Sequence, residues 1–361
     1  MKPIFQHKNK VFALIMAVLI AVVAIDRLLI DEEIFSALGY FYVIFLAVVI
    51  FQVAIPLYSH RRLTMYYWER TRKNRLSVFG LSFIVFLVLL ATLGPIFTLG
   101  PNEVNFDEKN LPPLGFTMTQ SVYDRGTGTF TSEETPGTWK HPLGTDDMGR
   151  DILAMIVSGA GVSLQVGLIA TLIALVIGTI IGVSSAYFGG MVDNVLMRFT
   201  DIVMTFPFFL LLVFIVFIFG ASLPLIILII GLTSWTGTAR LVRSEALSLR
   251  TRDFVLASRA LGASDSRIIF RHLVPNVMSP LIIIATLSIP GVILAEAALS
   301  FIGLGDPTVA SWGRILNSGQ SSLDTAWWIA VEPGIMLFLT VLSFNFLGDG
   351  LRDAFDPRSD I

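Results

Sequence analysis

The chain has 361 residues, of which 54% are hydrophobic and 14% charged, and its mean hydropathy is +0.77. Soluble domains carry about 25% charged residues, so this composition excludes an ordinary soluble protein. The net charge of −2 leaves no large basic face, which argues against a nucleic-acid partner. The absence of cysteine excludes disulfides and thiolate metal sites, and the four histidines lie too far apart in sequence to form a metal-ligand motif.

Long uncharged apolar runs alternate with short charged segments along the chain. Residues 34–58 and 153–192, for example, contain no Asp, Glu, Lys or Arg. A run of about 18 such residues predicts a membrane-spanning helix, whereas the strands of a membrane barrel alternate over only about ten residues. We therefore expect an all-α polytopic membrane protein with eight spans, near residues 11–30, 34–57, 76–98, 161–188, 202–220, 223–238, 275–300 and 329–348.

The basic residues predict the orientation of these spans. With the N-terminus in the cytoplasm, 19 of the 25 Lys and Arg residues fall on the inner side and six on the outer side. Cytoplasmic loops carry an excess of Lys and Arg, so both termini are expected inside. The external segment 99–160 is rich in turn residues and holds nine acidic and four basic side chains, which predicts a solvated acidic surface.

The internal segment from Arg252 to Asn276 carries the most structural signals in the chain. Asp253 can begin a helix, Gly262 can end it, and Ser264 can cap a second helix, after which Pro275 opens the next span. This pattern predicts a short helix, a glycine turn and a second helix on the cytoplasmic face. The alternative is an amphipathic helix that rests on the lipid headgroups.

Spaced motifs in this segment and elsewhere connect the chain to a known family. Leu256-Ala257-Ser258, Gly262 and His272-Leu-Val-Pro275 match a loop of the form E-A-A, three residues, G, about nine residues and I-x-L-P, with Leu256 in place of the Glu. Other typical stretches lie at 141–151, 190–193, 206–207, 234–243, 295–300, 311–313 and 344–352. On these residues the chain resembles the C-type permease subunits of ATP-binding-cassette importers for dipeptides, oligopeptides and nickel.

The resemblance covers roughly residues 70–358 and implies the type I importer transmembrane fold, with a six-helix core. Residues 1–60 would add a peripheral two-helix extension without substrate contact. Four domains are expected. The extension is 1–60, and 61–160 holds a basic linker, the first core span and the external loop. The permease core is 161–353, with a cytoplasmic coupling loop at 239–274, and the tail is 354–361.

A function also follows from the resemblance. It implies an inner-membrane permease subunit that forms half of the pathway for di- or oligopeptides, with nickel or oligosaccharides as alternatives. The implied partners are a homologous second permease subunit, two ATPase subunits and an external substrate-binding protein. A secondary transporter is the competing class, but it usually shows inverted repeats and ionisable residues at mid-depth, which this sequence lacks.

No enzymatic activity is expected of this chain. It contains no G-x-x-x-x-G-K-[ST] phosphate loop, so ATP and Mg are expected on the partner ATPase subunits and no cofactor or metal on this chain. The resemblance implies that the coupling loop seats in a groove of an ATPase subunit. The candidate coupling residues are Asp253, Ala257, Ser258, Gly262, Ala263, Ser264, Arg271, His272 and Pro275.

A second set of candidates concerns the transport pathway or its gating, namely Phe206, Pro207, Pro290 and Glu296. Proline removes a backbone donor and bends a span, so Pro207, Pro280 and Pro290 are expected to do so. An acid within a span is a functional candidate by default. Glu296 follows Pro275 by 21 residues, or about 30 Å of helix, so a hydrated cap at the outer boundary is the alternative to a gating role.

Overall fold

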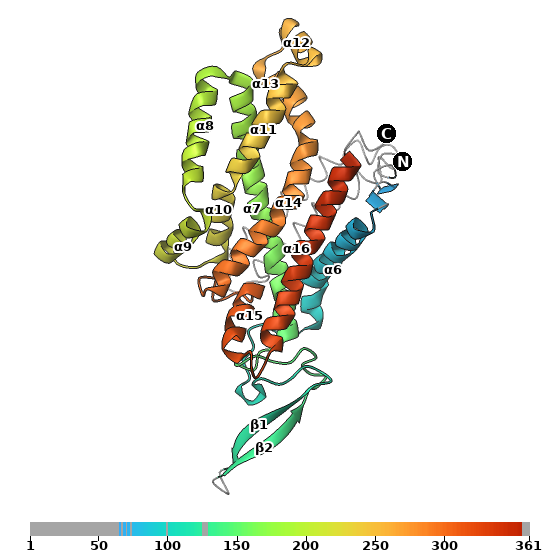
Figure 1. Ribbon diagram of the computed structural model, residues 1–361, viewed down its shortest axis with the longest axis vertical. Helices are drawn as coiled ribbons and strands as arrows, with labels where there is room; N and C mark the ends of the chain where they lie inside the picture. Colours follow the sequence, from blue (N-terminus) through green and yellow to red (C-terminus); the bar gives the residue numbers. More distant parts are fainter. Residues whose placement is uncertain are drawn as a thin grey trace, which may run out of the picture. The chain divides into compact units, whose positions relative to one another are not determined.

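The computed structural model describes residues 65–355, except 66–67, 70, 73, 99 and 125–128. The chain divides into two compact units, and the larger of them, Phe79–Arg352, contains helices α7 to α15 and the β-sheet (Figure 1). The two-span extension predicted for residues 1–60 lies outside the described residues, as does most of the predicted tail.

The described part of the chain is mainly helical, with one small sheet. Within it, five helices are long and apolar enough to cross a membrane, or six if the bent pair α8 and α9 counts as one span. Spanning helices form because lipid offers no partner to a free backbone group. The helices are α6 (Arg75–Phe97), α7 (Ile152–Phe188), α8 (Gly190–Thr205), α9 (Phe208–Phe219), α10 (Leu223–Thr233), α11 (Trp235–Arg250), α12 (Asp253–Ala260), α13 (Asp265–Ile268), α14 (Val274–Phe301), α15 (Trp312–Gly319) and α16 (Trp328–Phe355), with single turns η2 (Phe106–Glu108), η3 (Ile269–Leu273) and η4 (Gln320–Ser322).

Two helices extend beyond the apolar runs that predicted them. Helix α7 begins at Ile152 rather than near residue 161, because Asp151 caps it through a hydrogen bond from the backbone nitrogen of Ala154. Helix α11 continues to Arg250, so the first third of the predicted 239–274 coupling loop is helix. Its basic side chains suggested a loop, but acidic residues of α8 neutralise two of them.

The fifth predicted span is broken, as its proline suggested. Helix α8 ends at Thr205 and α9 begins at Phe208, and the two helices are bent by 76° across Phe206 and Pro207. This confirms the expected effect of Pro207. Helix α14 behaves differently, since it continues as one α-helix through Pro280 and Pro290.

Helix α7 is the central element of the larger unit and contacts α8, α10, α11, α14 and α15. Its glycines allow a close approach to α11. A Cβ atom on Gly182 would lie 2.5 Å from the carbonyl oxygen of Ala239, and one on Gly178 would lie 2.6 Å from the Cβ of Thr238. Small residues of this kind let two helix backbones pack directly against each other in a membrane.

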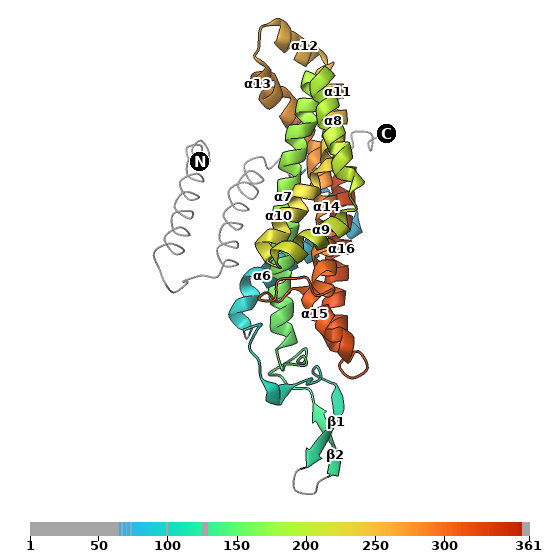
Figure 2. The ribbon, with the colours of Figure 1, turned by 90° about the vertical axis from the view of Figure 1, so that its left-hand side faces the viewer.

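An antiparallel hairpin lies at the end of this unit opposite α12, where only loop was expected (Figures 1 and 2). Strand β1 (Thr117–Asp124) pairs with β2 (Thr129–Pro136) along its full length, from Thr117 opposite Pro136 to Asp124 opposite Thr129. We call this the hairpin end of the unit, and the opposite end the α12 end.

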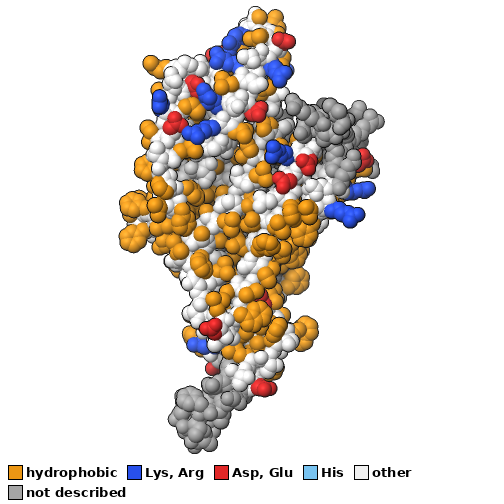
Figure 3. Space-filling model, viewed as in Figure 1, with side chains coloured by type: hydrophobic (Ala, Val, Ile, Leu, Met, Phe, Trp, Pro, Cys, Tyr) orange, Lys and Arg blue, Asp and Glu red, His pale blue; other side chains and the backbone are white. Residues whose placement is uncertain are grey.

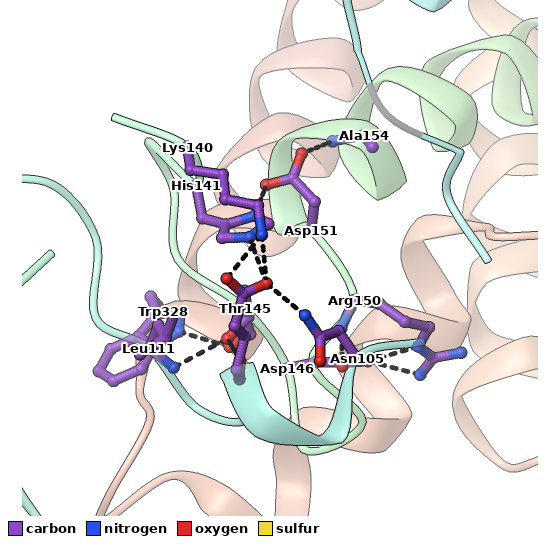
Figure 4. A network of polar contacts seen from close by, with 11 residues as sticks. Asn105, Leu111, Lys140, His141, Thr145, Asp146, Arg150, Asp151, Ala154 and Trp328 are labelled. Carbon is purple, nitrogen blue, oxygen red and sulfur yellow. Dashed lines mark hydrogen bonds and ion pairs between the residues drawn. The ribbon is translucent and has the colours of Figure 1, made fainter. Parts of the chain in front are cut away.

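A polar cluster of Glu108, Lys140, His141 and Asp151 joins the hairpin-end segment to α7 (Figure 4). The Nδ1 atom of His141 lies 3.0 Å from Asp151 and its Nε2 atom 3.2 Å from Glu108, which also accepts hydrogen bonds from Lys140 at 2.6 and 2.7 Å. Because Asp151 also caps α7, the cluster fixes the segment to the start of that helix.

Beside this cluster, charged groups that were expected to be solvated are buried and make further hydrogen bonds. Asp146 is fully buried and pairs with Arg150 at 2.6 Å, while its other oxygen accepts backbone hydrogen bonds. The backbone oxygen of Thr145 accepts a hydrogen bond from the indole of Trp328 at the start of α16. The prediction of a solvated acidic surface is therefore wrong for Asp146, Arg150 and Asp151, because ion pairs and hydrogen bonds within the protein satisfy these groups.

The close α7–α11 packing predicts a large cost for one added methyl group. Gly182→Ala places its Cβ against a backbone atom that can move only with its helix, so the protein should lose about 1–3 kcal/mol of stability. Thermal unfolding of the detergent-solubilised protein measures this loss. Gly237→Ala on α11, where an added Cβ meets nothing within 4 Å, is the matched control. Equal melting temperatures for the two variants would contradict the packing argument.

The polar cluster predicts a pH-dependent loosening of the hairpin end. The hydrogen bond from Lys140 holds the pKa of Glu108 below its usual range; partial burial opposes this shift and His141 adds to it. The contact therefore stabilises the segment above the unfolded carboxyl pKa, about 4.3, and this stabilisation is lost as the pH falls through the lower folded-state pKa. Hydrogen-exchange protection of residues 108–111 should drop across that range.

The control for this pH effect is a second carboxyl in the same segment. Glu108→Gln should lower the protection of residues 108–111 at neutral pH and flatten its pH dependence, whereas Glu103→Gln, at an exposed position outside the cluster, should change neither. An unchanged pH profile in Glu108→Gln would assign the loosening to another group.

Candidate functional site

The helix–turn–helix at the α12 end adopts the shape expected from its sequence. Asp253 is the first residue of α12, and the hydroxyl of Ser264 accepts the backbone hydrogen bond that caps α13. The one-turn helix α13 then runs through the π-helical turn η3 into α14, so that Asp265–Phe301 forms a single long span candidate. The second helix of the predicted loop is thus the start of a spanning helix.

Gly262 ends α12 with a positive φ of 78°. The backbone nitrogen of Gly262 donates to the oxygen of Arg259, and that of Ala263 donates to the oxygen of Ser258. These two hydrogen bonds form a Schellman motif, whose left-handed position favours glycine. The predicted glycine turn is therefore present.

This tip, residues 251–273, sits on three spanning helices. Val255, Ile268 and Leu273 are buried and belong to one apolar cluster with residues of α7, α11 and α14. The hydroxyl of Tyr187, near the end of α7, donates a 2.6 Å hydrogen bond to Asp265 at the start of α13. Because of these contacts, a displacement of the tip would also displace α7, α11 and α14.

A second set of contacts holds the two halves of the tip together. The Oγ atom of Ser258 in α12 lies 3.2 Å from the Nε2 atom of His272 in η3. The ring of His272 also faces that of Phe254, with the ring centroids 6.0 Å apart. Two residues predicted from the sequence, Ser258 and His272, thus meet across the turn.

The outward surface of the tip combines apolar and charged side chains. Leu261, just after α12, is 88% exposed, which is unusual for a large apolar residue outside a lipid-facing span. Phe270 is 71% exposed and lies within the span candidate Asp265–Phe301. Six of the predicted coupling residues are exposed and the other three are half-buried. The exposed ones are Asp253, Ala257, Gly262, Ser264, Arg271 and Pro275, and the half-buried ones are Ser258, Ala263 and His272. This surface can bind a groove on another protein.

Two ion pairs that sequence reasoning missed connect α8 to α11, below the tip. Arg243 makes a bidentate pair with Asp193 at 2.6 Å for both contacts, and Asp193 also accepts a hydrogen bond from Ser185 of α7. Arg240 pairs with Asp201 at 2.6 Å. The available signal was the spacing of Arg240, Arg243 and Arg250 by three and seven residues, which places them on one face of a helix.

The four predicted pathway residues do not form one site. Phe206 and Pro207 lie at the exposed break between α8 and α9, and Pro290 is buried within α14. Glu296 is only 2% exposed, and the hydroxyl of Ser300 donates to one of its oxygens. The alternative of a hydrated cap for Glu296 is therefore wrong, because α15 packs over this part of α14. Among the described residues, no group of three or more His, Cys, Asp or Glu side chains has an arrangement that could hold a metal ion.

Comparison with known proteins gives two family matches. The family described as "Binding-protein-dependent transport system inner membrane component" matches residues 174–361, which include α8 to α16. The family described as "N-terminal TM domain of oligopeptide transport permease C" matches residues 63–113.

Individual relatives match over most of the chain. The dipeptide transport system permease protein of Bacillus subtilis (strain 168) is 37% identical over 81% of this chain and 84% of its own length. The oligopeptide transport system permease protein of Haemophilus influenzae is 36% identical over 80% of this chain and 87% of its own. The oligopeptide permease protein of Escherichia coli (strain K12) is 37% identical over 81% of this chain and 91% of its own.

Proposed function

The chain belongs to the family of binding-protein-dependent transport system inner-membrane components, and from this premise we propose that it is the permease subunit of an ATP-driven importer for di- or oligopeptides. It is a multi-pass protein of the inner membrane. In the proposed complex it forms half of the translocation pathway. Its relatives are named as dipeptide or oligopeptide permeases, which supports peptides as the substrate class.

The proposed topology has eight spans with both termini in the cytoplasm. Residues 1–60 supply two of them, and the remaining six are α6, α7, the α8–α9 pair, α10 with α11, α14 and α16. Figure 3 shows hydrophobic side chains around the middle of the molecule and Lys and Arg side chains over α8, α11 and α12. An excess of Lys and Arg is typical of the cytoplasmic side, which supports placing the α12 end there.

The observation that carries this proposal is the seating of the tip on α7, α11 and α14. We assign ATPase docking to the nine predicted coupling residues, eight in the tip and Pro275 just after it, together with the exposed Leu261. Closure of an ATPase dimer would push on the tip, and the helices beneath would move as rigid elements. The partners are a homologous permease subunit, two ATPase subunits and an external binding protein. ATP and Mg would bind to the ATPase subunits, which leaves this chain non-catalytic.

Gly262 offers a direct test of this docking. Gly262→Val should strain the left-handed turn by about 1–2 kcal/mol and misdirect the tip, although an added Cβ meets nothing within 4 Å. Peptide uptake by the assembled complex should fall while its subunits still co-purify. Gly262→Asn, which tolerates this backbone conformation, is the matched control and should retain uptake. Normal coupled uptake with Gly262→Val would remove the turn from the mechanism.

Reconstitution tests the function as a whole. The chain, its partner permease and both ATPase subunits are placed in liposomes, and uptake of a radiolabelled dipeptide is measured with the binding protein outside and ATP inside. Uptake should require ATP and all four membrane-associated subunits. Uptake by the chain alone, driven by an ion gradient, would instead identify a secondary transporter.

A further inference from the structure

A cavity of about 400 Å³ lies at mid-depth in the larger unit, between α7, α9, α10, α11 and α14. Its position can be judged from α14, which is 28 residues or about 42 Å long, and whose contributing residue Ser288 lies about halfway along. The volume falls within the range of about 300–1,000 Å³ that is usual for small-molecule sites. None of the four pathway residues predicted from the sequence lines it.

Five of the residues that line this cavity carry a hydroxyl group, and none of its described lining residues is charged. The five are Thr171, Thr233, Ser234, Thr238 and Ser288. In a membrane helix a hydroxyl usually donates to a carbonyl of its own helix, as Thr233 does at 2.7 Å. Thr171 is only 3% exposed, and its buried hydroxyl has no hydrogen-bond partner. The hydroxyls of Ser234, Thr238 and Ser288 make no hydrogen bond with any described residue.

Two interruptions of regular helix converge on the same cavity. Phe208 begins α9 directly after the 76° break at Phe206 and Pro207, and Ser234 is the junction between α10 and α11. Interrupted backbone at membrane depth is tolerated where it is buried in protein or lines a polar cavity. Broken helices also border the substrate sites of many transporters, because they turn backbone groups toward the ligand.

From these observations we propose that the hydroxyl-lined cavity is a transit site for the neutral backbone amide groups of the transported peptide. This inference rests on the proposed function and adds the site and the recognised group. An amide both donates and accepts, as a hydroxyl does, and every peptide carries amides whatever its side chains are. The walls offer no counter-charge, so charged termini and side chains must stay in the hydrated part of the pathway.

The chemistry of the cavity suits passage rather than retention. Each hydroxyl–amide hydrogen bond changes affinity by about two- to tenfold, so a few of them replace the water lost by the peptide without trapping it. A transport site must bind well enough for entry and weakly enough for exit. Recognition of the backbone alone would accept many peptide sequences.

Gly291 and Gly237 provide a matched pair for blocking the cavity. A Cβ on either residue meets nothing within 4 Å, but only Gly291 lines the cavity. In the full reconstituted complex with the binding protein, Gly291→Leu should reduce uptake of radiolabelled trialanine at least about tenfold, since its side chain would occupy the site of several hydrogen bonds. Gly237→Leu should leave uptake within about twofold of wild type, the range of one weak contact.

Removal of hydroxyls tests the recognised chemistry. Thr171→Val combined with Ser288→Ala should raise the trialanine concentration needed for half-maximal uptake several-fold. Thr286→Val on α14 is the control, because that hydroxyl donates to Ile282 of its own helix and does not line the cavity. Wild-type uptake in both Gly291→Leu and the hydroxyl double variant would overturn the inference.

The absence of cysteine permits a test that does not depend on these variants folding well. In the full complex, Ser288→Cys should react with a small methanethiosulfonate reagent more slowly during trialanine import than without trialanine. Gly237→Cys should react equally fast in both conditions. Unchanged reactivity at Ser288→Cys during measurable import would overturn the inference, whereas failure of the wild-type complex to import any peptide would refute the proposed function instead.

Discussion

The direct backbone contact between α7 and α11 is the constraint on which most of the larger unit depends. Lipid is as apolar as a leucine side chain, so spanning helices associate through close packing and polar contacts rather than through removal from water. At Gly178 and Gly182 an added Cβ would lie within 2.6 Å of α11. Gly159 and Gly167 of the same helix face side chains instead, since an added Cβ would lie 2.4 Å from Trp312 of α15 and 3.0 Å from Ile289 and Ile293 of α14. The glycines of α7 therefore determine how closely three neighbouring helices, α11, α14 and α15, pack against it.

The position of α11 in turn determines where the tip lies. Arg240 and Arg243 of α11 hold α8 beside it, and Arg250 donates to the backbone oxygen of Ala186 at the end of α7. The chain turns into α12 directly after Arg250, so the tip starts from a point fixed by three helices. Apolar burial of Val255 and Ile268 then completes its attachment.

The sequence was most informative wherever a local rule decides the structure. Uncharged runs located α6 and α14 within two residues, Pro207 marked the break, and Gly262 with Ser264 predicted the turn and the cap. Features that depend on distant partners were missed. The buried charges around His141, the ion pairs of α11 and the burial of Glu296 depend on residues brought together only by the fold. The cavity escaped for the same reason, because single hydroxyls in apolar runs carry no signal until several helices bring them together.

The length of α7 couples the movements of the two ends of the larger unit. This helix runs for 37 residues, about 56 Å, without a proline or a break. Asp151 ties its first turn to the hairpin-end cluster, and Tyr187 ties its last turn to the tip. A stiff rod held at both ends has few independent motions, so the two ends can translate or tilt only together. An event on one face of the membrane would then register on the other within a single rigid-body movement, without a chain of local rearrangements.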